Sequence, residues 1–181
     1  YDVKISDDSL DPLRIGLQGQ VDGEYEQITY FGRGPQENYS DRYDGIFLGT
    51  WDTSVSDMMF NYVYPQENGN RTAVRWISMT DLNGSGIQFL GIEPLSVSVW
   101  NTTQDELQNA KHVGEPQLLR DAFVINVDHV QTGVGGTDSW SQSARPSDQY
   151  RLMDKHYSYS FYVRPVKDRA DAVAAGRKLC R

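Results

Sequence analysis

Carboxylates in short polar segments are the side chains of this sequence best suited to acid–base chemistry. Glu37, Asp41 and Glu67 belong to the residue types that glycoside hydrolases use in pairs. The chain carries 25 acidic residues, so some of them must lie close together without any catalytic role. Loop-bracing ion pairs are therefore the stronger interpretation. We expect Glu37 to pair with Arg33, and Asp41 to pair with Arg42.

Two other combinations of reactive residues do not meet the requirements of their chemistry. Residues 32–34, Gly-Arg-Gly, resemble the start of a dinucleotide-binding fingerprint, but Glu37 stands at the third glycine position and no helical pattern follows. Asp128, His129 and Ser139 have the residue types of a hydrolytic triad. However, Ser139 lacks the Gly-x-Ser-x-Gly context, and adjacent Asp and His is not a typical triad spacing.

Two loops place an aromatic ring beside hydrogen-bonding side chains, a combination that suits sugars because pyranose C–H bonds pack on aromatic faces. In the first loop Tyr39 follows Asn38 and precedes Asp41. In the second, Trp140 follows Asp138. Most other aromatic residues are expected in the core. For Trp140, the residue types alone favour packing on the protein body and contact with a ligand equally.

A period-two alternation of apolar and polar residues predicts that strands position these segments. The clearest runs are residues 95–100, 123–128 and 157–163, and each is expected to bury one face and expose the other. Asp-Gly and Asn-Gly pairs between the runs predict turns. Further strands are expected at residues 14–20, 27–31, 45–51, 72–79 and 87–92. Short strands without long helices between them favour an all-β antiparallel sandwich.

Two short helices and one long loop complete the predicted elements. Thr102 or Thr103 is a candidate N-cap for a helical turn over residues 104–110, with Glu106 at the capping-box position after Thr103. A terminal helix is predicted over residues 168–179, although Gly176 inside it lowers the helix propensity. Residues 132–149 form the longest stretch without a periodic pattern, and loops of that length are usually functional or disordered.

Composition is typical of a globular protein and argues against several classes of partner. The chain has 181 residues, of which 38% are hydrophobic and 23% charged, and no apolar run is long enough for a membrane-spanning helix. The net charge of −8 opposes binding to nucleic acid. One cysteine, Cys180, and three histidines argue against a structural zinc site. We expect no signal peptide in this segment, and the sequence leaves a bacterial cytoplasmic or periplasmic location open.

Three motifs, in this order, resemble segments of the large bacterial β-galactosidases of glycoside hydrolase family 2. Residues 30–42, YFGRGPQENYSDR, are similar to the family's Y-G-R-G-P-x-E-N-Y-x-D-R. Residues 62–71, YVYPQENGNR, resemble Y-V-x-P-x-E-N-G-x-R, and residues 133–140, GVGGTDSW, resemble G-[IV]-G-G-D-D-S-W. Thr137 stands where the family often has Asp, so it lacks the charge for an ion pair there. The resemblance extends over roughly residues 12–165.

The matched region is the C-terminal small-chain domain (domain 5) of those enzymes. The resemblance therefore implies an all-β antiparallel supersandwich like that of galactose mutarotase, with a short C-terminal helix. We expect the β-sandwich over residues 1–166 and a short helical tail over residues 167–181. The family's domain is longer than this chain, so part of the sandwich is expected to be missing, with an exposed sheet edge as the consequence.

The resemblance also implies that catalysis takes place outside this chain. In the family, terminal β-D-galactosides are hydrolysed with retention by two glutamates on a TIM barrel, so Glu37 and Glu67 are not assigned that role. Trp140 has the position of a family tryptophan that reaches into the barrel's pocket and stacks on the sugar. The residues expected to support this loop through backbone freedom and local hydrogen bonds are Gly133, Gly135, Gly136, Asp138 and Ser139.

Partners and ions follow from the same resemblance. The barrel of the same polypeptide and a β-galactoside are the expected partners, and the full enzyme is expected to be a homo-oligomer that binds Mg²⁺ and Na⁺. This segment is expected to hold no cofactor of its own, and neither nucleic acid nor a membrane is an expected partner. A family sodium site of main-chain carbonyls corresponds to Tyr64, Pro65, Leu107 and Ala110. The candidates for secondary contacts with sugar or at an interface are Arg33, Glu37, Asn38, Asp41 and Arg42.

Two alternative functions remain open at the level of sequence. An autonomous carbohydrate-binding module would use Tyr39, Asn38, Asp41 and Trp140 as its own site. An aldose mutarotase would share the fold, but it needs a general acid and a general base in one pocket. His112 or His129 could serve there only if it were buried beside a carboxylate in a cleft.

Overall fold

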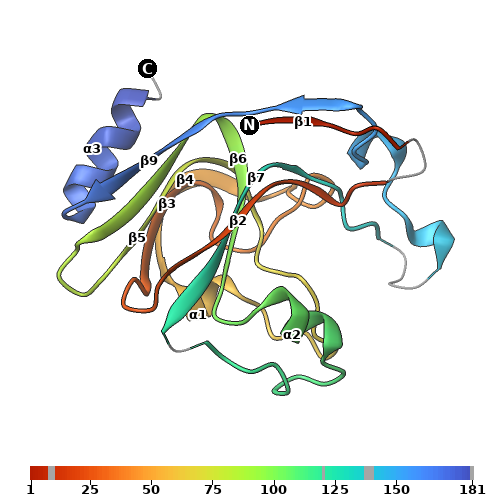
Figure 1. Cartoon of the computed structure of the whole chain (residues 1–181), viewed down its shortest axis with the longest axis horizontal. Coiled ribbons are helices and arrows are strands. Elements are labelled where there is room, and N and C mark those ends of the chain that lie inside the picture. Colours follow the sequence, from red (N-terminus) through yellow and green to blue (C-terminus); the bar gives the residue numbers. More distant parts are fainter. Residues whose placement is uncertain (8–10, 120, 137–140, 180–181) are drawn as a thin grey trace.

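Antiparallel strands make up most of the computed structural model, which describes residues 1–7, 11–119, 121–136 and 141–179. Figure 1 shows the strands curving around a shared interior. Helix α3 (Arg169–Leu179) lies beside one end of the sheet, and α1 (Val55–Met58) and α2 (Gln104–Asn109) lie below the strands as drawn. The predicted all-β class with a short C-terminal helix is confirmed.

Nine strands are formed by the residues that the structure describes, and all except the one at Asp2–Lys4 lie close to the predicted runs. Two predicted runs, residues 87–92 and 95–100, are one continuous strand, and the run at 157–163 is interrupted at residues 159–160. The strand predicted from Gly45 begins two residues later, because Gly45 adopts a φ of 79° in the preceding turn. The strands are β1 (Asp2–Lys4), β2 (Arg14–Asp22), β3 (Gln27–Gly34), β4 (Phe47–Ser54), β5 (Arg71–Thr80), β6 (Gly86–Trp100), β7 (Ala122–Gln131), β8 (His156–Ser158) and β9 (Phe161–Val166).

Strand β6 organises the larger sheet, whose order is β2-β7-β6-β5-β3-β4, with β9 also paired to β6. All of these pairs are antiparallel. The 15 residues of β6 accommodate two neighbours on one edge, because β9 pairs with residues 86–91 and β7 pairs with residues 96–100. Strands β1 and β8 form a separate two-stranded sheet.

The main hydrophobic core lies on the inner face of the curved sheet. Alternate residues of the central strands point into it, for example Val97 and Val99 of β6 beside Ile125 and Val127 of β7. Tyr159, between β8 and β9, closes this core, and its hydroxyl donates a hydrogen bond of 3.2 Å to the carbonyl of Val127. The segment between β8 and β9 therefore packs on the same core as the larger sheet.

The outer face of the central strands is also buried, which corrects the expectation that residues 95–100 and 123–128 expose one face. Trp100 and Val124 pack beneath Leu107 of α2. At the other end, Trp76 packs beneath Ala172 of α3. The helices thus supply a second layer of apolar cover that single-strand periodicity does not reveal.

Between these two ends, the outer face buries polar side chains that satisfy one another. Asn126 of β7 donates a hydrogen bond of 3.0 Å to Ser98 of β6, and both residues are almost fully buried. Asn126 also accepts a bond of 2.9 Å from Gln18 of β2. Because buried polar groups need partners, this row fixes how β2, β7 and β6 align.

Side-chain oxygens begin both of the predicted helices. Thr103 accepts the backbone N–H of Glu106 at 3.2 Å, as the capping pattern predicts. Glu106 does not complete the capping box with its own cap residue: it accepts the backbone N–H of Gln117 at 3.1 Å. In α3, Asp168 accepts the N–H of Asp171 at 2.7 Å. Within the described parts of the chain, no helix combines the length and apolar composition needed to span a membrane.

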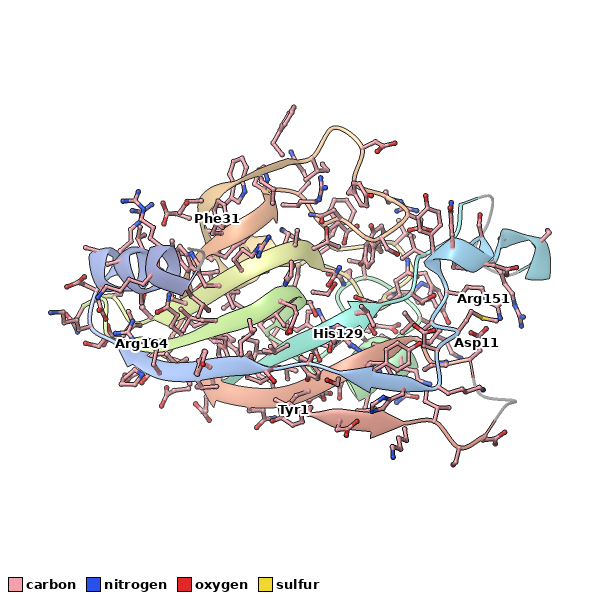
Figure 2. The ribbon with its side chains drawn as sticks, turned by 90° about the horizontal axis from the view of Figure 1, so that it is seen from above. Tyr1, Asp11, Phe31, His129, Arg151 and Arg164 are labelled. Carbon is pink, nitrogen blue, oxygen red and sulfur yellow. The ribbon has the colours of Figure 1, made fainter. Side chains whose placement is uncertain are left out.

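The long loop at residues 132–149 contains more structure than its sequence indicates. Two 3₁₀ turns form in and just after it, η1 (Gln142–Ala144) and η2 (Asp148–Tyr150). Arg151 then pairs with Asp148 at 3.0 Å and with Asp11 at 2.8 Å. Figure 2 shows Arg151 and Asp11 together at the end of the molecule opposite Arg164.

Replacing Gly176 by Ala tests how closely α3 packs on the sheet. Alanine normally stabilises a helix interior by about 1 kcal/mol relative to glycine. Here, a Cβ at residue 176 would lie 2.1 Å from Nε1 of Trp76. We therefore expect Gly176→Ala to lower the free energy of unfolding by about 1–3 kcal/mol, measured by urea denaturation. Arg177→Ala on the exposed side of the helix should change it little, and a gain in stability for Gly176→Ala would contradict this packing.

Candidate functional site

The three sequence motifs meet in space although they are far apart in the chain. Residues 37–42 follow β3, residues 62–71 lead into β5, and residues 132–136 follow β7. Hydrogen bonds join the first segment to each of the other two. This motif junction, formed by residues 37–42, 67–72 and 132–136, is the candidate functional site.

Asn38 joins the first two motifs and is fully buried. Its Oδ1 accepts the backbone N–H of Thr72 at 2.8 Å and the hydroxyl of Thr72 at 2.5 Å. Its Nδ2 donates to the carbonyls of Arg33 at 3.2 Å and Gln36 at 2.9 Å. Its own backbone N–H donates to the carbonyl of Asn70 at 2.8 Å. The amide is thus fully used inside the protein, and no polar atom of it is left for a ligand.

Glu37 adds a second set of contacts between the same two motifs. Its Oε2 accepts the backbone N–H of Gly69 at 2.8 Å, and its Oε1 accepts the hydroxyl of Tyr62. Burial, together with this carboxylate, raises the pKa of Tyr62 to about 12, so the phenol stays protonated and acts as the donor. Gly69 has a φ of 77°, and a Cβ there would lie 2.5 Å from the carbonyl oxygen of Met58, so the position requires glycine.

Asp41 connects the first motif to the third. Its Oδ1 accepts the backbone N–H of Val134 at 3.0 Å, and its Oδ2 accepts the N–H of Gly135 at 2.8 Å. The turn that carries Asp41 is itself closed by two backbone hydrogen bonds between Tyr39 and Arg42, of 3.1 and 2.9 Å. A carboxylate from one loop therefore holds two successive amides of another loop, 93 and 94 residues away in the chain.

The ion pairs expected from the sequence, Glu37 with Arg33 and Asp41 with Arg42, are replaced by these bonds to backbone and phenol groups. Arg33 instead donates to the carbonyl of Ile46 at 3.1 Å and places its guanidinium 4.2 Å from the ring centre of Tyr43. The side chain of Arg42 is exposed. The five candidate contact residues do cluster, but four of them are held by contacts inside the chain: Arg33, Glu37, Asn38 and Asp41.

Glu67 of the second motif belongs to a network that includes the buried residue Asp128, which the sequence analysis did not assign to the site. It lies 3.1 Å from Nη1 of Arg14 and accepts a hydrogen bond of 2.6 Å from Gln131. Arg14 also donates to Asp128 at 2.5 and 3.1 Å and lies over the ring of Trp100 at 5.7 Å. Burial raises the pKa of Asp128 to about 6, although Arg14 opposes that shift. The network attaches the second motif to β2 and β7.

The proposed sugar-contacting residue itself lies outside the described residues, as do Thr137, Asp138 and Ser139 of the same loop. The chain is described up to residue 136 and again from residue 141. Gly133 donates to the carbonyl of Tyr150 at 2.8 Å, and Gly135 lies against the backbone of Ala144. A Cβ at residue 136 would meet no atom of the described residues within 4 Å. The two ends of the loop are therefore held side by side next to Asp41.

A pocket of about 320 Å³ opens beside the second motif. Two of the four residues expected to provide sodium-binding carbonyls, Pro65 and Leu107, line it. Tyr64 is exposed, and Ala110 caps α2. No cluster of three His, Cys, Asp or Glu side chains that could bind a metal occurs among the described residues. The sequence analysis did not identify two further lining residues of this pocket, Phe60 and Asn101. The apolar run from Met58 to Phe60 could have indicated Phe60.

Neither His112 nor His129 contacts a carboxylate through its ring among the described residues, as the acid–base pair of a mutarotase would require; His156 does contact Asp2, but at the exposed surface. His129 stacks on Tyr159 with ring centres 5.6 Å apart, near the middle of the molecule as drawn in Figure 2. Adjacent strand residues point to opposite faces, so Asp128 binds Arg14 on the other side of the sheet. The backbone N–H of His112 donates to Glu115 at 3.1 Å in an exposed loop.

Comparison with known proteins gives one consistent result. The family model described as "Beta galactosidase small chain" matches residues 2–163. A protein named beta-galactosidase from Halalkalibacterium halodurans is 38% identical over 154 residues, which cover 84% of this chain and 15% of the relative. One from Leuconostoc mesenteroides is 35% identical over 152 residues, covering 83% of this chain and 14% of the relative. The chain thus spans about 15% of the length of these relatives.

Asn38→Ala tests whether the junction depends on this buried amide. The substitution leaves the N–H of Thr72 and two carbonyls without partners, and each unsatisfied buried group costs about 1–3 kcal/mol. We expect the free energy of unfolding to fall by about 3 kcal/mol or more. Chemical denaturation measures it, with Asn109→Ala on the exposed surface of α2 as the control. A loss below about 1 kcal/mol would show that the junction does not rely on Asn38.

The raised pKa of Asp128 predicts a specific pH dependence of stability. Between pH 4 and pH 6 the folded chain retains a proton that the unfolded chain has lost, so this group's contribution to stability falls as the pH rises. A shift to about 6 corresponds to roughly 3 kcal/mol across that window. We expect the stability of the wild type relative to Asp128→Asn to decline by that order between pH 4 and pH 7.

Asp52 provides a control of opposite sign. Its hydrogen bond with Arg169 lowers its pKa, so its contribution is present at neutral pH and is lost on acidification. The stability of the wild type relative to Asp52→Asn should therefore rise with pH in the acid range. A wild-type to Asp128→Asn difference that stays constant from pH 4 to pH 7 would show that Asp128 titrates normally.

Proposed function

The chain belongs to the β-galactosidase small-chain family, and on that premise we propose that it is the non-catalytic C-terminal domain of an enzyme that hydrolyses terminal β-D-galactosides. The observation that carries the proposal is the match of residues 2–163 to the family, together with relatives named beta-galactosidase at 32–38% identity. The whole enzyme would retain the anomeric configuration through a glycosyl-enzyme intermediate, as expected for two closely spaced carboxyl groups.

The catalytic carboxylates would lie on a TIM barrel elsewhere in the same polypeptide. This assignment is supported by the way that the present chain uses its own glutamates. Glu37 holds Gly69 and Tyr62, and Glu67 holds Arg14 and Gln131, so each is bound into the fold. A general acid and a nucleophile must both reach the glycosidic bond. We therefore expect the isolated chain to have no hydrolytic activity.

The contribution of this domain would be to complete the substrate pocket with Trp140. An indole face packs well against the C–H bonds of a pyranose. Support comes from the described parts of the loop: residues 132–135 are bonded to Leu13, Asp41 and Tyr150 before the chain reaches Trp140. A loop held in this way could present its aromatic ring in one place without a large ordering cost.

The proposal also includes the ions and partners of the full enzyme. Mg²⁺ would be bound outside this chain, near the barrel's catalytic groups. Na⁺ would be held here by main-chain carbonyls of Tyr64, Pro65, Leu107 and Ala110, which fits the position of Pro65 and Leu107 on one pocket. Carbonyl oxygens are suitable ligands for such hard cations. The barrel, the β-galactoside and further copies of the full enzyme would be the partners.

Calorimetry and a hydrolysis assay separate this proposal from an autonomous sugar-binding module. We would titrate the 181-residue chain with galactose, lactose and allolactose and compare Trp140→Ala. We expect neither measurable heat nor hydrolysis by the chain alone, because the sugar site needs the barrel. Saturable binding that is lost in Trp140→Ala would instead establish an independent sugar-binding module, and hydrolysis by the purified chain would contradict the location of the catalytic groups.

A hybrid enzyme tests the positive half of the proposal. In it, this chain replaces the matching 154-residue segment of the Halalkalibacterium halodurans relative. We expect the hybrid to hydrolyse a β-galactoside, and Trp140→Ala to lower kcat/KM by about two- to tenfold, since aromatic stacking contributes about 0.5–1.5 kcal/mol beyond burial. Trp140→Phe keeps an aromatic face and should retain most of the activity. Equal activity of Trp140→Ala and wild type would refute pocket completion by this residue.

A further inference from the structure

We propose that Asp41 is the positioning residue of the aromatic loop, an inference that rests on the proposed function of Trp140. The carboxylate accepts one hydrogen bond on each oxygen, from the N–H groups of Val134 and Gly135. Two successive amides that converge on one anion form a concave anion-binding backbone arrangement, here with Gly135 at a φ of 73°. In this chain the anion is supplied by a distant loop of the same protein.

The glycines of the third motif are explained by this contact. A Cβ at residue 133 would lie 2.5 Å from Oδ2 of Asp41. A Cβ at residue 135 would lie 1.9 Å from the carbonyl oxygen of Ala144, on the returning side of the loop. The outgoing side of the loop is therefore in contact with Asp41 at residue 133 and with the returning side at residue 135. Backbone freedom alone would not require glycine at both residues 133 and 135.

Asp41 can act as a fixed point because its own turn is anchored to the sheet. Tyr39 and Arg42 close the turn through their backbone groups, and Asn38 at its base is bonded to Thr72 at the start of β5. The path from the sheet to the loop is thus a series of hydrogen bonds: those of Asn38 with Thr72 and of Asp41 with Gly135 are half-buried, and that of Asp41 with Val134 is exposed. Hydrogen bonds to a charged carboxylate are stronger than neutral ones, so Asp41 would hold the loop in a fixed position relative to the sheet.

Amide hydrogen exchange in the 181-residue chain tests the contact itself. Asp41→Asn keeps the size of the side chain but removes the charge and one acceptor oxygen. We expect the amides of residues 134 and 135 to exchange at least about tenfold faster, with the rest of the sheet unchanged. Asp81→Asn is the matched control: Asp81 also accepts two backbone N–H groups, of Asn83 and Ser85, in a turn remote from the loop. Unchanged exchange at residues 134 and 135 in Asp41→Asn would overturn the proposal.

Steady-state kinetics of the hybrid enzyme tests the functional consequence. If Asp41 acts through Trp140, Asp41→Asn should raise KM several-fold with a smaller change in kcat, and should have no further effect when Trp140→Ala is already present. Asp81→Asn should leave both constants unchanged. Equal loss from Asp41→Asn in the presence and absence of Trp140 would reveal a general structural role and overturn the proposal.

The two proposals fail in different ways. If Trp140→Ala leaves KM and kcat of the hybrid unchanged, pocket completion by Trp140 is refuted, and with it the route through which Asp41 would act. If Trp140→Ala raises KM while Asp41→Asn does not, only the positioning role of Asp41 is refuted. A rise in KM for both single variants, without additivity in the double variant, supports both proposals.

Discussion

The buried amide of Asn38 is the contact through which the first motif acquires a defined position. An amide has two donor hydrogens and an acceptor oxygen, and here both ends are used: Oδ1 by Thr72, and Nδ2 by two carbonyls of its own loop. An unsatisfied amide at full burial would cost several kcal/mol, so alternative arrangements of this loop are strongly disfavoured. Glu37 and Asp41 flank Asn38 closely in the chain, and their carboxylates reach Gly69 and Gly135 from the loop that Asn38 holds.

Acidic side chains in this protein accept hydrogen bonds from backbone N–H groups more often than the ion pairs expected from the sequence would suggest. Asp41, Asp81, Glu106 and Asp168 each accept at least one backbone N–H, Asp81 in a turn, Asp168 at a helix start, and Asp41 and Glu106 from another loop. Backbone N–H groups without a partner in a helix or sheet lose hydrogen bonds to water when the chain folds. Carboxylates replace those bonds, and their negative charge makes the new bonds stronger. An isolated ion pair at the surface contributes little by comparison. A chain dominated by strands and loops has many such N–H groups, and here acidic side chains accept hydrogen bonds from them.

Sequence patterns predicted the strands well because alternation at residues 123–128, for example, follows directly from the geometry of a pleated strand. They did not predict that both faces of these strands are buried. Asn126 and Asp128 look like solvent-facing residues, but Asn126 bonds to Gln18 and Asp128 to Arg14, each more than one hundred residues away in the chain. Gly176 shows the same limit of sequence patterns. In the sequence it only lowers the helix propensity, whereas in the structure Trp76 lies too close for any side chain at this position.

The motif resemblance located the junction residues, but the contacts that they make depend on tertiary structure. The free energies involved are consistent with the proposed role of these contacts in completing the substrate pocket. Stacking of one aromatic ring contributes about 0.5–1.5 kcal/mol beyond burial. Fixing the backbone of a single residue costs about 1–2 kcal/mol. If residues 133–135 became ordered only when sugar arrived, that cost would cancel the stacking contribution several times over. The hydrogen bonds from Asp41 and Tyr150 remove the cost in advance, because they hold this backbone before any substrate is present. A rigid sheet that carries a carboxylate to the base of the loop is therefore what would make an aromatic contact effective at a distant active site.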